Sequence, residues 1–207
     1  MSAPVRTGEL TIDDRRRVEE ILVATGVFRD AEVEVALELF DETFPASIHR
    51  AAAPTPASTV TPPADAGSPA PTRHDTHTAP VADDGYRFVG AFGANDELIG
   101  YACYGSTPDA DRTWDLYWIA VDPAAQGAGG GTTLLSEVER RVIGLEARML
   151  VVETSSRSDY DPTRRFYLAR GYEETARVGD FYAPADDRII FTKRFPPMPP
   201  EGRSHNE

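Results

Sequence analysis

Apolar positions in the second half of the chain alternate between strand-length runs and helical spacing. An aromatic, apolar run over 114–121 is followed by Pro123, by a glycine-rich stretch, and by apolar residues at helical spacing from Leu134 to Leu145. A second continuous apolar run over 148–153 is typical of a parallel strand covered on both faces. The pattern predicts a strand, a loop, a helix and a second strand, with the helix crossing between two parallel strands.

The rest of the chain predicts three more helices and five more strands. The helices run from about Ile12 to Gly26 behind a Thr11–Asp14 capping box, from a cap at Asp30 past Phe40, and from a cap at Asp161 to Gly171 with Pro162 in the first turn. The strands are expected over 4–8, 86–92, 98–105, 172–178 and 188–195, with a hairpin turn at 93–96 and a loop at 180–184.

One segment between these predicted elements has a different composition. Of the thirty residues 51–80, eight are Ala, seven Pro, six Thr and two Ser, and Val60 is the only large aliphatic residue. Such a segment cannot bury enough apolar surface to offset its ordering entropy. We expect one domain made of 1–44 and 83–195, a disordered insertion over 45–82, and a disordered tail over 196–207. The insertion is either a tolerated surface loop or a segment that docks a partner.

Charge and cysteine content exclude several classes of ligand and metal site. The formal net charge of −13 argues against nucleic acid and favours a cationic amine substrate. No apolar run approaches the roughly 20 residues of a membrane-spanning helix. The single Cys103 excludes an intramolecular disulfide and a cysteine-rich metal site. We therefore expect a cytoplasmic protein that uses no metal, binds no membrane, and is a monomer or homodimer.

The glycine-rich loop, with glycines at 127, 129, 130 and 131, precedes a helix, so it leaves backbone amides open where a helix N-terminus attracts anions. A P-loop is excluded because no lysine lies between Trp114 and Leu150. A dinucleotide fingerprint is weak because Thr132 stands where its third glycine belongs. An ordinary glycine-rich turn is the remaining structural alternative.

The order Gln126-x-x-Gly129-x-Gly131 resembles the acyl-coenzyme A loop of the GCN5-related N-acetyltransferase (GNAT) superfamily. Phe166-Tyr167-x-x-x-Gly171-Tyr172 resembles its second signature, in the expected order. The resemblance implies an α/β (α+β) fold: a mixed, twisted sheet of six to seven strands with about four helices. It also implies acetyl-coenzyme A (acetyl-CoA) as cosubstrate, bound by Ile119, Val121, Gln126, Gly127, Ala128, Gly129, Gly130, Gly131 and Thr132.

Within the superfamily the chain is loosely similar to bacterial ribosomal-protein N-terminal acetyltransferases, through Glu153 and the 180–184 loop. The insertion and the extra residues 158–160 fall where substrate-binding loops would be. The acceptor therefore cannot be carried over from the resemblance, and we expect either an amine-bearing small molecule or a protein N-terminus. The leading reading is an acetyl-CoA-dependent N-acetyltransferase acting by direct attack of a primary amine. The alternative is a non-catalytic acyl-CoA-binding module whose insertion recruits a partner.

Direct transfer needs a base for the amine and a proton donor for the departing thiolate. All four histidines lie in the predicted insertion or tail, so the base should be a carboxylate. Glu153 is the preferred candidate because burial at the end of an apolar strand would raise its pKa. Asp115 is the second candidate, and Tyr167 is the expected acid unless it only packs against Tyr172.

Other side chains have two possible roles. Cys103 is expected to be a small core residue rather than an acyl carrier. Arg157, Arg164 and Arg165 either meet cofactor phosphates or form a solvated helix face. Tyr117, Trp118, Phe181 and Tyr182 are expected to pack in the core and loops, with a substrate cage as the alternative.

Overall fold

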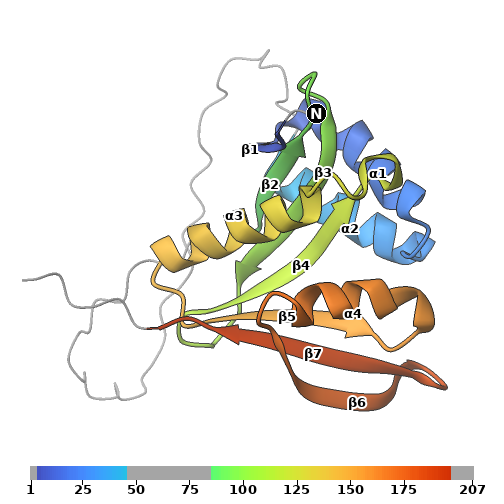
Figure 1. Ribbon diagram of the computed structural model, residues 1–207, viewed down its shortest axis with the longest axis vertical. Helices are drawn as coiled ribbons and strands as arrows, with labels where there is room; N and C mark the ends of the chain where they lie inside the picture. The colour runs from blue at the N-terminus through green and yellow to red at the C-terminus, as the bar shows by residue number, and fades with distance from the viewer. Residues whose placement is uncertain (1–3, 46–84, 197–207) are drawn as a thin grey trace, which may run out of the picture. The chain divides into compact units, whose positions relative to one another are not determined.

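The computed structural model describes residues 4–45 and 85–196. Nearly all of the expected insertion and tail lies outside these residues, as do the four histidines, so the partition into domain, insertion and tail stays a prediction. The described residues form seven strands, four α-helices and three short 3-10 turns, as the sequence predicts (Figure 1). The strands are β1 (Arg6–Gly8), β2 (Arg87–Phe92), β3 (Leu98–Ser106), β4 (Thr113–Val121), β5 (Met149–Ser155), β6 (Glu173–Ala183) and β7 (Asp186–Arg194). The helices are α1 (Arg15–Thr25), α2 (Asp30–Thr43), α3 (Gly130–Gly144) and α4 (Asp161–Leu168).

All strands join one mixed sheet in the order β1-β2-β3-β4-β5-β7-β6. Only β4 and β5 pair in parallel, as expected for strands joined by a crossover helix. Their pairing extends from Thr113 and Met149 to Leu116 and Val152, although both strands continue beyond these residues. The sheet therefore opens between the second half of β4 and the end of β5.

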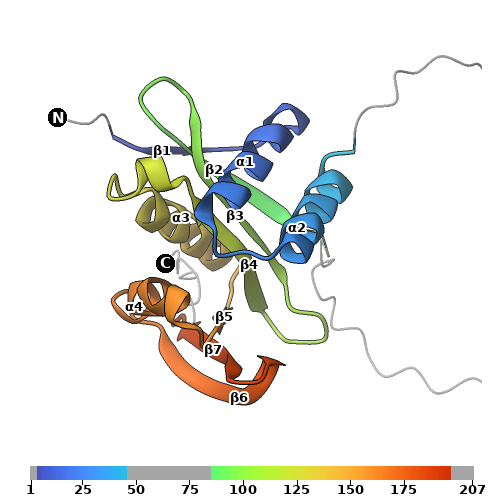
Figure 2. The same cartoon turned by 90° about the vertical axis from the view of Figure 1, so that its right-hand side faces the viewer.

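Two cores cover the two faces of the sheet. Helices α3 and α4 pack on one face through Leu134, Val138 and Tyr167. Helices α1 and α2 pack on the other face through Ile21 and Phe40 (Figure 2). Most positions of the expected helical stripes are therefore buried, but Leu145, predicted in the stripe of α3, lies after the helix ends at Gly144 and is 42% exposed. The opening between β4 and β5 lies between the two layers. No helix in the described part of the chain is long and apolar enough to cross a membrane.

Helix starts differ slightly from the predicted caps. The carboxylate of Asp14 accepts a hydrogen bond from the Thr11 amide at 2.8 Å, as a capping box requires, but a 3-10 turn (Ile12–Asp14) precedes α1. Asp30 and Asp161, predicted as caps, are instead the first residues of α2 and α4, after Arg29 and Tyr160. A carboxylate in the first helical turn still favours the helix dipole.

The C-terminal hairpin differs more from the prediction. The loop expected at 180–184 is the irregular end of β6, where the register to β7 shifts between Val178 and Ala183. The Asp180 amide donates to the Asp187 carboxylate at 3.0 Å, and the Ala185 amide donates to the Asp180 carboxylate at 2.6 Å. These side-chain acceptors replace ladder partners, so the strand continues through residues that strand propensity disfavours.

Candidate functional site

The glycine loop joins β4 to α3 in the geometry that the sequence implies. Asp122 accepts the Ala124 amide at 2.8 Å and starts a 3-10 turn (Pro123–Ala125). Gly127 and Gly129 then adopt φ of 83° and 90°, which only glycine enters without strain. Gly129 caps α3, so the amides of the first helical turn have no carbonyl within the helix to bond and point out of its end.

A salt bridge holds this loop against α1. Arg17 donates to the Asp122 carboxylate and, through Nε, to the Leu98 carbonyl at 3.0 Å. The Ala124 amide and the Arg17 guanidinium hold the pKa of Asp122 below its ordinary value. Asp122 is therefore charged at neutral pH and fixes the turn from which the glycine loop starts.

One cavity runs from the glycine loop into the opening of the sheet. This loop cavity has a volume of about 370 Å³ and lies between β4, the end of β5, and α4. Gln126 and Gly131 line it near the loop, Ile119 and Val121 line it along β4, and Tyr167 lines it from α4. It is long enough to lead from the helix N-terminus to the separation of β4 and β5.

Tyr167 is the most buried aromatic residue of this cavity. Its side chain packs against Tyr172 and Phe191 with ring centroids 5.4 Å and 6.0 Å away, and burial raises the pKa of its phenol well above the ordinary value. Its hydroxyl has no hydrogen-bond partner among the described residues. The phenol therefore stays protonated at neutral pH and has a proton to donate.

A second cavity opens beneath the β6–β7 hairpin. This hairpin cavity has a volume of about 480 Å³, and residues of the α1–α2 connection, β4, β5 and β7 line it. The two cavities share seven lining residues: Phe28, Leu116, Tyr117, Trp118, Glu153, Thr154 and Tyr160. They therefore meet where β4 and β5 separate. Opposite this point the register of β3 with β4 shifts and leaves Tyr117 out of the pairing.

The two candidate bases have different surroundings in the hairpin cavity. Glu153 pairs with Arg188, and its side chain is 37% exposed, so it is not desolvated as the sequence reasoning expected. Asp115 is half-buried, and its carboxylate accepts a hydrogen bond from the Thr107 hydroxyl at 2.7 Å. Burial raises the pKa of Asp115, while Thr107 and Arg188 oppose the shift. The environment predicted for Glu153 belongs to Asp115.

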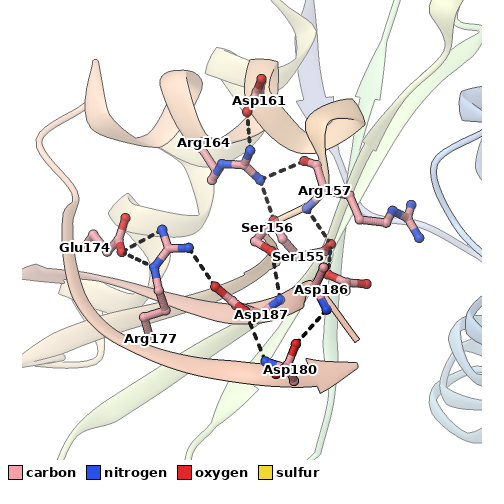
Figure 3. Close-up of polar contacts among 11 residues, drawn as sticks. Ser155, Ser156, Arg157, Asp161, Arg164, Glu174, Arg177, Asp180, Asp186 and Asp187 are labelled. Atoms are coloured by element: carbon pink, nitrogen blue, oxygen red, sulfur yellow. Dashed lines mark hydrogen bonds and ion pairs between the residues drawn. The ribbon is translucent and has the colours of Figure 1, made fainter. Parts of the chain in front are cut away.

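A polar network fixes the hairpin onto the end of β5 (Figure 3). The Ser155 hydroxyl donates to the buried Asp186, and the Arg157 amide donates to the Ser155 oxygen at 3.0 Å. The Asp187 amide donates to the Ser156 hydroxyl at 2.7 Å. The hairpin therefore holds a fixed position beside the cavity, which Tyr182 lines.

Sequence comparison identifies the family. The model of the acetyltransferase (GNAT) family matches residues 48–172. This chain belongs to the GNAT acetyltransferase family. No curated protein sequence matches it significantly.

Solved structures agree with the GNAT assignment. A GNAT-family protein from Desulfovibrio desulfuricans is 34% identical, with 94% of this chain and 99% of that chain covered and a TM-score of 0.68. The ribosomal-protein-S18-alanine N-acetyltransferase from Escherichia coli is 14% identical, with 98% and 99% covered and a TM-score of 0.61. The PaiA N-acetyltransferase from Thermoplasma acidophilum in complex with coenzyme A is 15% identical, with 93% and 100% covered and a TM-score of 0.58. At identities this low the last two show the fold alone, so the finer likeness to ribosomal-protein acetyltransferases says nothing about the acceptor.

Within this GNAT domain the predicted cofactor residues divide into two groups. Ile119, Val121, Gln126 and Gly131 line the loop cavity. Gly127, Ala128 and Gly129 form the exposed crest of the loop, Gly130 is buried, and Thr132 lies on the exposed side of the first turn of α3. All nine residues lie in the second half of β4, in the loop, or in the first turn of α3, but only four of them line the cavity.

Among the residues that the sequence analysis missed, three lie beside the loop cavity or at the start of α3. Thr154 is 4% exposed, lines both cavities, and its hydroxyl has no partner among the described residues. Tyr160 lines both cavities, and burial raises its pKa to about 12. Arg170 donates to the Thr132 hydroxyl and stacks 3.7 Å from the Phe166 ring, which brings a cation to the start of α3. The Tyr160 stretch was visible only as extra residues, and nothing in the pattern placed Arg170 beside α3.

The remaining candidates have structural partners. Arg164 donates to the carbonyls of Ser155 and Arg157, and Arg157 pairs with Asp159 at 2.7 Å, so both guanidiniums hold the β5–α4 connection. Arg165 is exposed. Cys103 is 1% exposed, lines neither cavity, and has its pKa raised by burial. The expectation that Cys103 is a core residue is confirmed.

Proposed function

We propose that this protein transfers the acetyl group of acetyl-CoA to a primary amine by direct attack. The observation that carries the proposal is the meeting of two cavities where β4 and β5 separate. One cavity begins at a helix N-terminus suited to phosphates, and the other contains a half-buried carboxylate. Two ligands, one in each cavity, would meet at this point.

Acetyl-CoA fits the chemistry of the loop cavity. The open amides at the start of α3 and the guanidinium of Arg170 suit a pyrophosphate, even in a protein of net charge −13. The apolar walls at Ile119, Val121 and Phe166 suit an extended chain, and the free hydroxyl of Thr154 can bond a polar group of that chain. The coenzyme A and acetyl-CoA complexes among similar GNAT structures support this proposal.

The chemistry needs a base for the attacking amine and an acid for the departing thiolate. We assign Asp115 the role of taking a proton from the attacking ammonium, directly or through water, because its raised pKa makes it a better base. The neutral amine forms the new C–N bond while the thioester C–S bond breaks. Tyr167 donates its proton to the leaving sulfur, and the nitrogen loses its second proton as the amide forms. One of the two protons taken from the nitrogen restores Tyr167 through water and the other is released to solvent, so the products are an N-acetyl amine, coenzyme A and one proton. Cys103 is too deeply buried for an acyl-enzyme route.

Thiol release separates this function from the binding-module alternative. Both readings predict that isothermal titration detects acetyl-CoA binding to the full-length protein. Only an acetyltransferase releases free thiol faster when amines are added from a panel of amino acids, polyamines, aminoglycosides and peptides. Binding without amine-dependent release from any member would favour the non-catalytic module.

Gly129→Ala should weaken acetyl-CoA binding about tenfold. A Cβ at φ of 90° has open space around it, so the change adds backbone strain of about 1–3 kcal/mol without a steric clash. The loop relieves that strain by moving the amides at the start of α3. Isothermal titration measures the affinity, and thermal melting checks the fold.

Gly144→Ala is the matched control on the same helix. Gly144 also has open space around it but no positive φ, so its substitution should leave affinity unchanged and raise stability slightly. Equal affinities for Gly129→Ala, Gly144→Ala and wild type would refute the assignment of this loop to the phosphates.

A further inference from the structure

The hairpin cavity is lined by three arginines as well as by four carboxylates, Glu32, Asp115, Glu153 and Asp186. Arg29, Arg157 and Arg188 line it, although the protein as a whole has a net charge of −13. A guanidinium beside a cationic substrate repels it at every pH at which enzymes work. The cavity therefore offers groups of both signs, which suits an acceptor that carries an anionic group as well as an ammonium.

Two of these arginines have donors left over. The Arg157 guanidinium is occupied by Asp159 and by the Val27 carbonyl. Within residues 4–45 and 85–196, Arg29 makes one side-chain hydrogen bond, from Nη2 to Asp186 at 3.0 Å, and Arg188 makes one to Glu153. Each guanidinium has five N–H donors, so Arg29 and Arg188 can still bind an anion that enters the cavity.

The carboxylates of the cavity are not equally available. Asp186 is 4% exposed and is bonded by Ser155 and Arg29, so it anchors the hairpin. Glu32 accepts the Arg29 amide at 2.7 Å, at the start of α2. Glu153 is paired with Arg188, which leaves Asp115 as the carboxylate suited to receive an ammonium. Two guanidiniums and one carboxylate that can bind a ligand therefore line the same cavity.

The rest of the lining is largely aromatic. The ring-bearing residues are Phe28, Tyr117, Trp118, Tyr160 and Tyr182. A cavity of about 480 Å³ is within the range for small-molecule sites, and aromatic walls bind apolar groups. The space is suited to a compact molecule with an apolar side chain.

We propose that the acceptor is a free α-amino acid with an apolar or aromatic side chain. Its carboxylate binds Arg29 and Arg188, its ammonium faces Asp115, and its side chain packs on the aromatic wall. This inference rests on the proposed acetyl transfer. The reaction converts the amino acid and acetyl-CoA into the N-acetyl amino acid, coenzyme A and one proton.

Pairs of amines that differ only in the carboxylate test the inference. Phenylalanine is compared with 2-phenylethylamine, leucine with 3-methylbutylamine, and both amino acids with spermidine and a phenylalanine-initiated peptide. Thiol release by the full-length protein is the readout. We expect kcat/KM to be at least about tenfold higher for each amino acid than for its decarboxylated partner, because only the amino acid pairs with the arginines.

Variants at Arg29 test whether this residue causes the preference for a carboxylate. Arg29→Gln should raise KM for phenylalanine at least about fivefold with little change in kcat, and should leave KM for 2-phenylethylamine unchanged. Arg29→Lys keeps the charge beside Asp186 but not the fork geometry, so we expect an intermediate KM and a wild-type melting temperature. Arg16→Gln, on α1 at a side chain that is 88% exposed, is the control and should match wild type.

The possible failures can be told apart. Amine-dependent thiol release with 2-phenylethylamine or spermidine equal to or faster than with amino acids would overturn the amino-acid proposal and leave the acetyltransferase function standing. Preference for the peptide over both free amino acids would overturn it in favour of a protein N-terminus. No release with any amine would remove the proposed function itself.

Discussion

Replacing Tyr167 by phenylalanine is expected to lower kcat by at least about tenfold, with acetyl-CoA affinity and melting temperature close to wild type. Phenylalanine keeps the ring contacts with Tyr172 and Phe191 and removes only the hydroxyl. That hydroxyl has no hydrogen-bond partner among the described residues, so its loss breaks no bond of the fold. A slower reaction in a stable protein would then report the loss of a proton donor.

Two other tyrosines serve as controls. Tyr172 is equally buried, but its hydroxyl donates to Glu139 at 3.0 Å, so Tyr172→Phe should cost about 1 kcal/mol of stability and leave kcat unchanged. Tyr160→Phe removes the hydroxyl of a half-buried tyrosine that lines both cavities. The kinetics require an amine for which chemistry limits the rate. Unchanged kcat in Tyr167→Phe under that condition would exclude Tyr167 as the acid. A lower kcat in Tyr160→Phe alone would indicate that Tyr160 is the acid instead.

Local patterns in the sequence were sufficient for the half of the site that binds the cofactor. Pro123 ends β4, Gly129 requires a left-handed φ, and helical spacing begins at once, so strand, loop and helix follow from short-range signals. Tyr167 was predicted for the same reason, since its place on α4 depends on a helix bounded by Pro162 and Gly171. The parallel pairing of β4 and β5 follows from the crossover, but the residue at which they separate does not.

The acceptor half depends on contacts between distant residues, which no local pattern encodes. Arg29 reaches Asp186 across 157 positions, and Ser155 reaches the same carboxylate across 31. The 180–184 segment was expected as a loop because Asp180 and Pro184 are poor strand residues, whereas the side chain of Asp187 supplies the missing acceptor. The expectation that Glu153 is desolvated also depended on a distant residue. Arg188 of the neighbouring strand β7 pairs with Glu153, and this contact could not be predicted from the sequence around Glu153.

Asp115→Asn is expected to lower kcat/KM by about 10²–10⁴-fold at pH 7, and Glu153→Gln by less. The pH dependence separates loss of a base from loss of structure. As pH rises, more of the amine is deprotonated in solution, so the deficit of Asp115→Asn should shrink toward high pH. Asp96→Asn, on an exposed turn where the native φ is 60°, is the control and should follow the wild-type profile.

Asp115→Asn should also leave the stability at pH 7 unchanged or higher. Burial raises the folded-state pKa of Asp115 above its ordinary value of 3.8, so the folded protein binds the proton more tightly than the unfolded chain. Its contribution is therefore greatest at pH values below 3.8 and is lost as pH rises through the folded-state pKa, which leaves a buried charge at pH 7. Asparagine can still accept the Thr107 hydroxyl and carries no charge, so the melting temperature at pH 7 should equal or exceed that of wild type. A stable Asp115→Asn protein with wild-type kcat/KM at pH 7 would show that the base is another group, with Glu153→Gln as the next variant to compare.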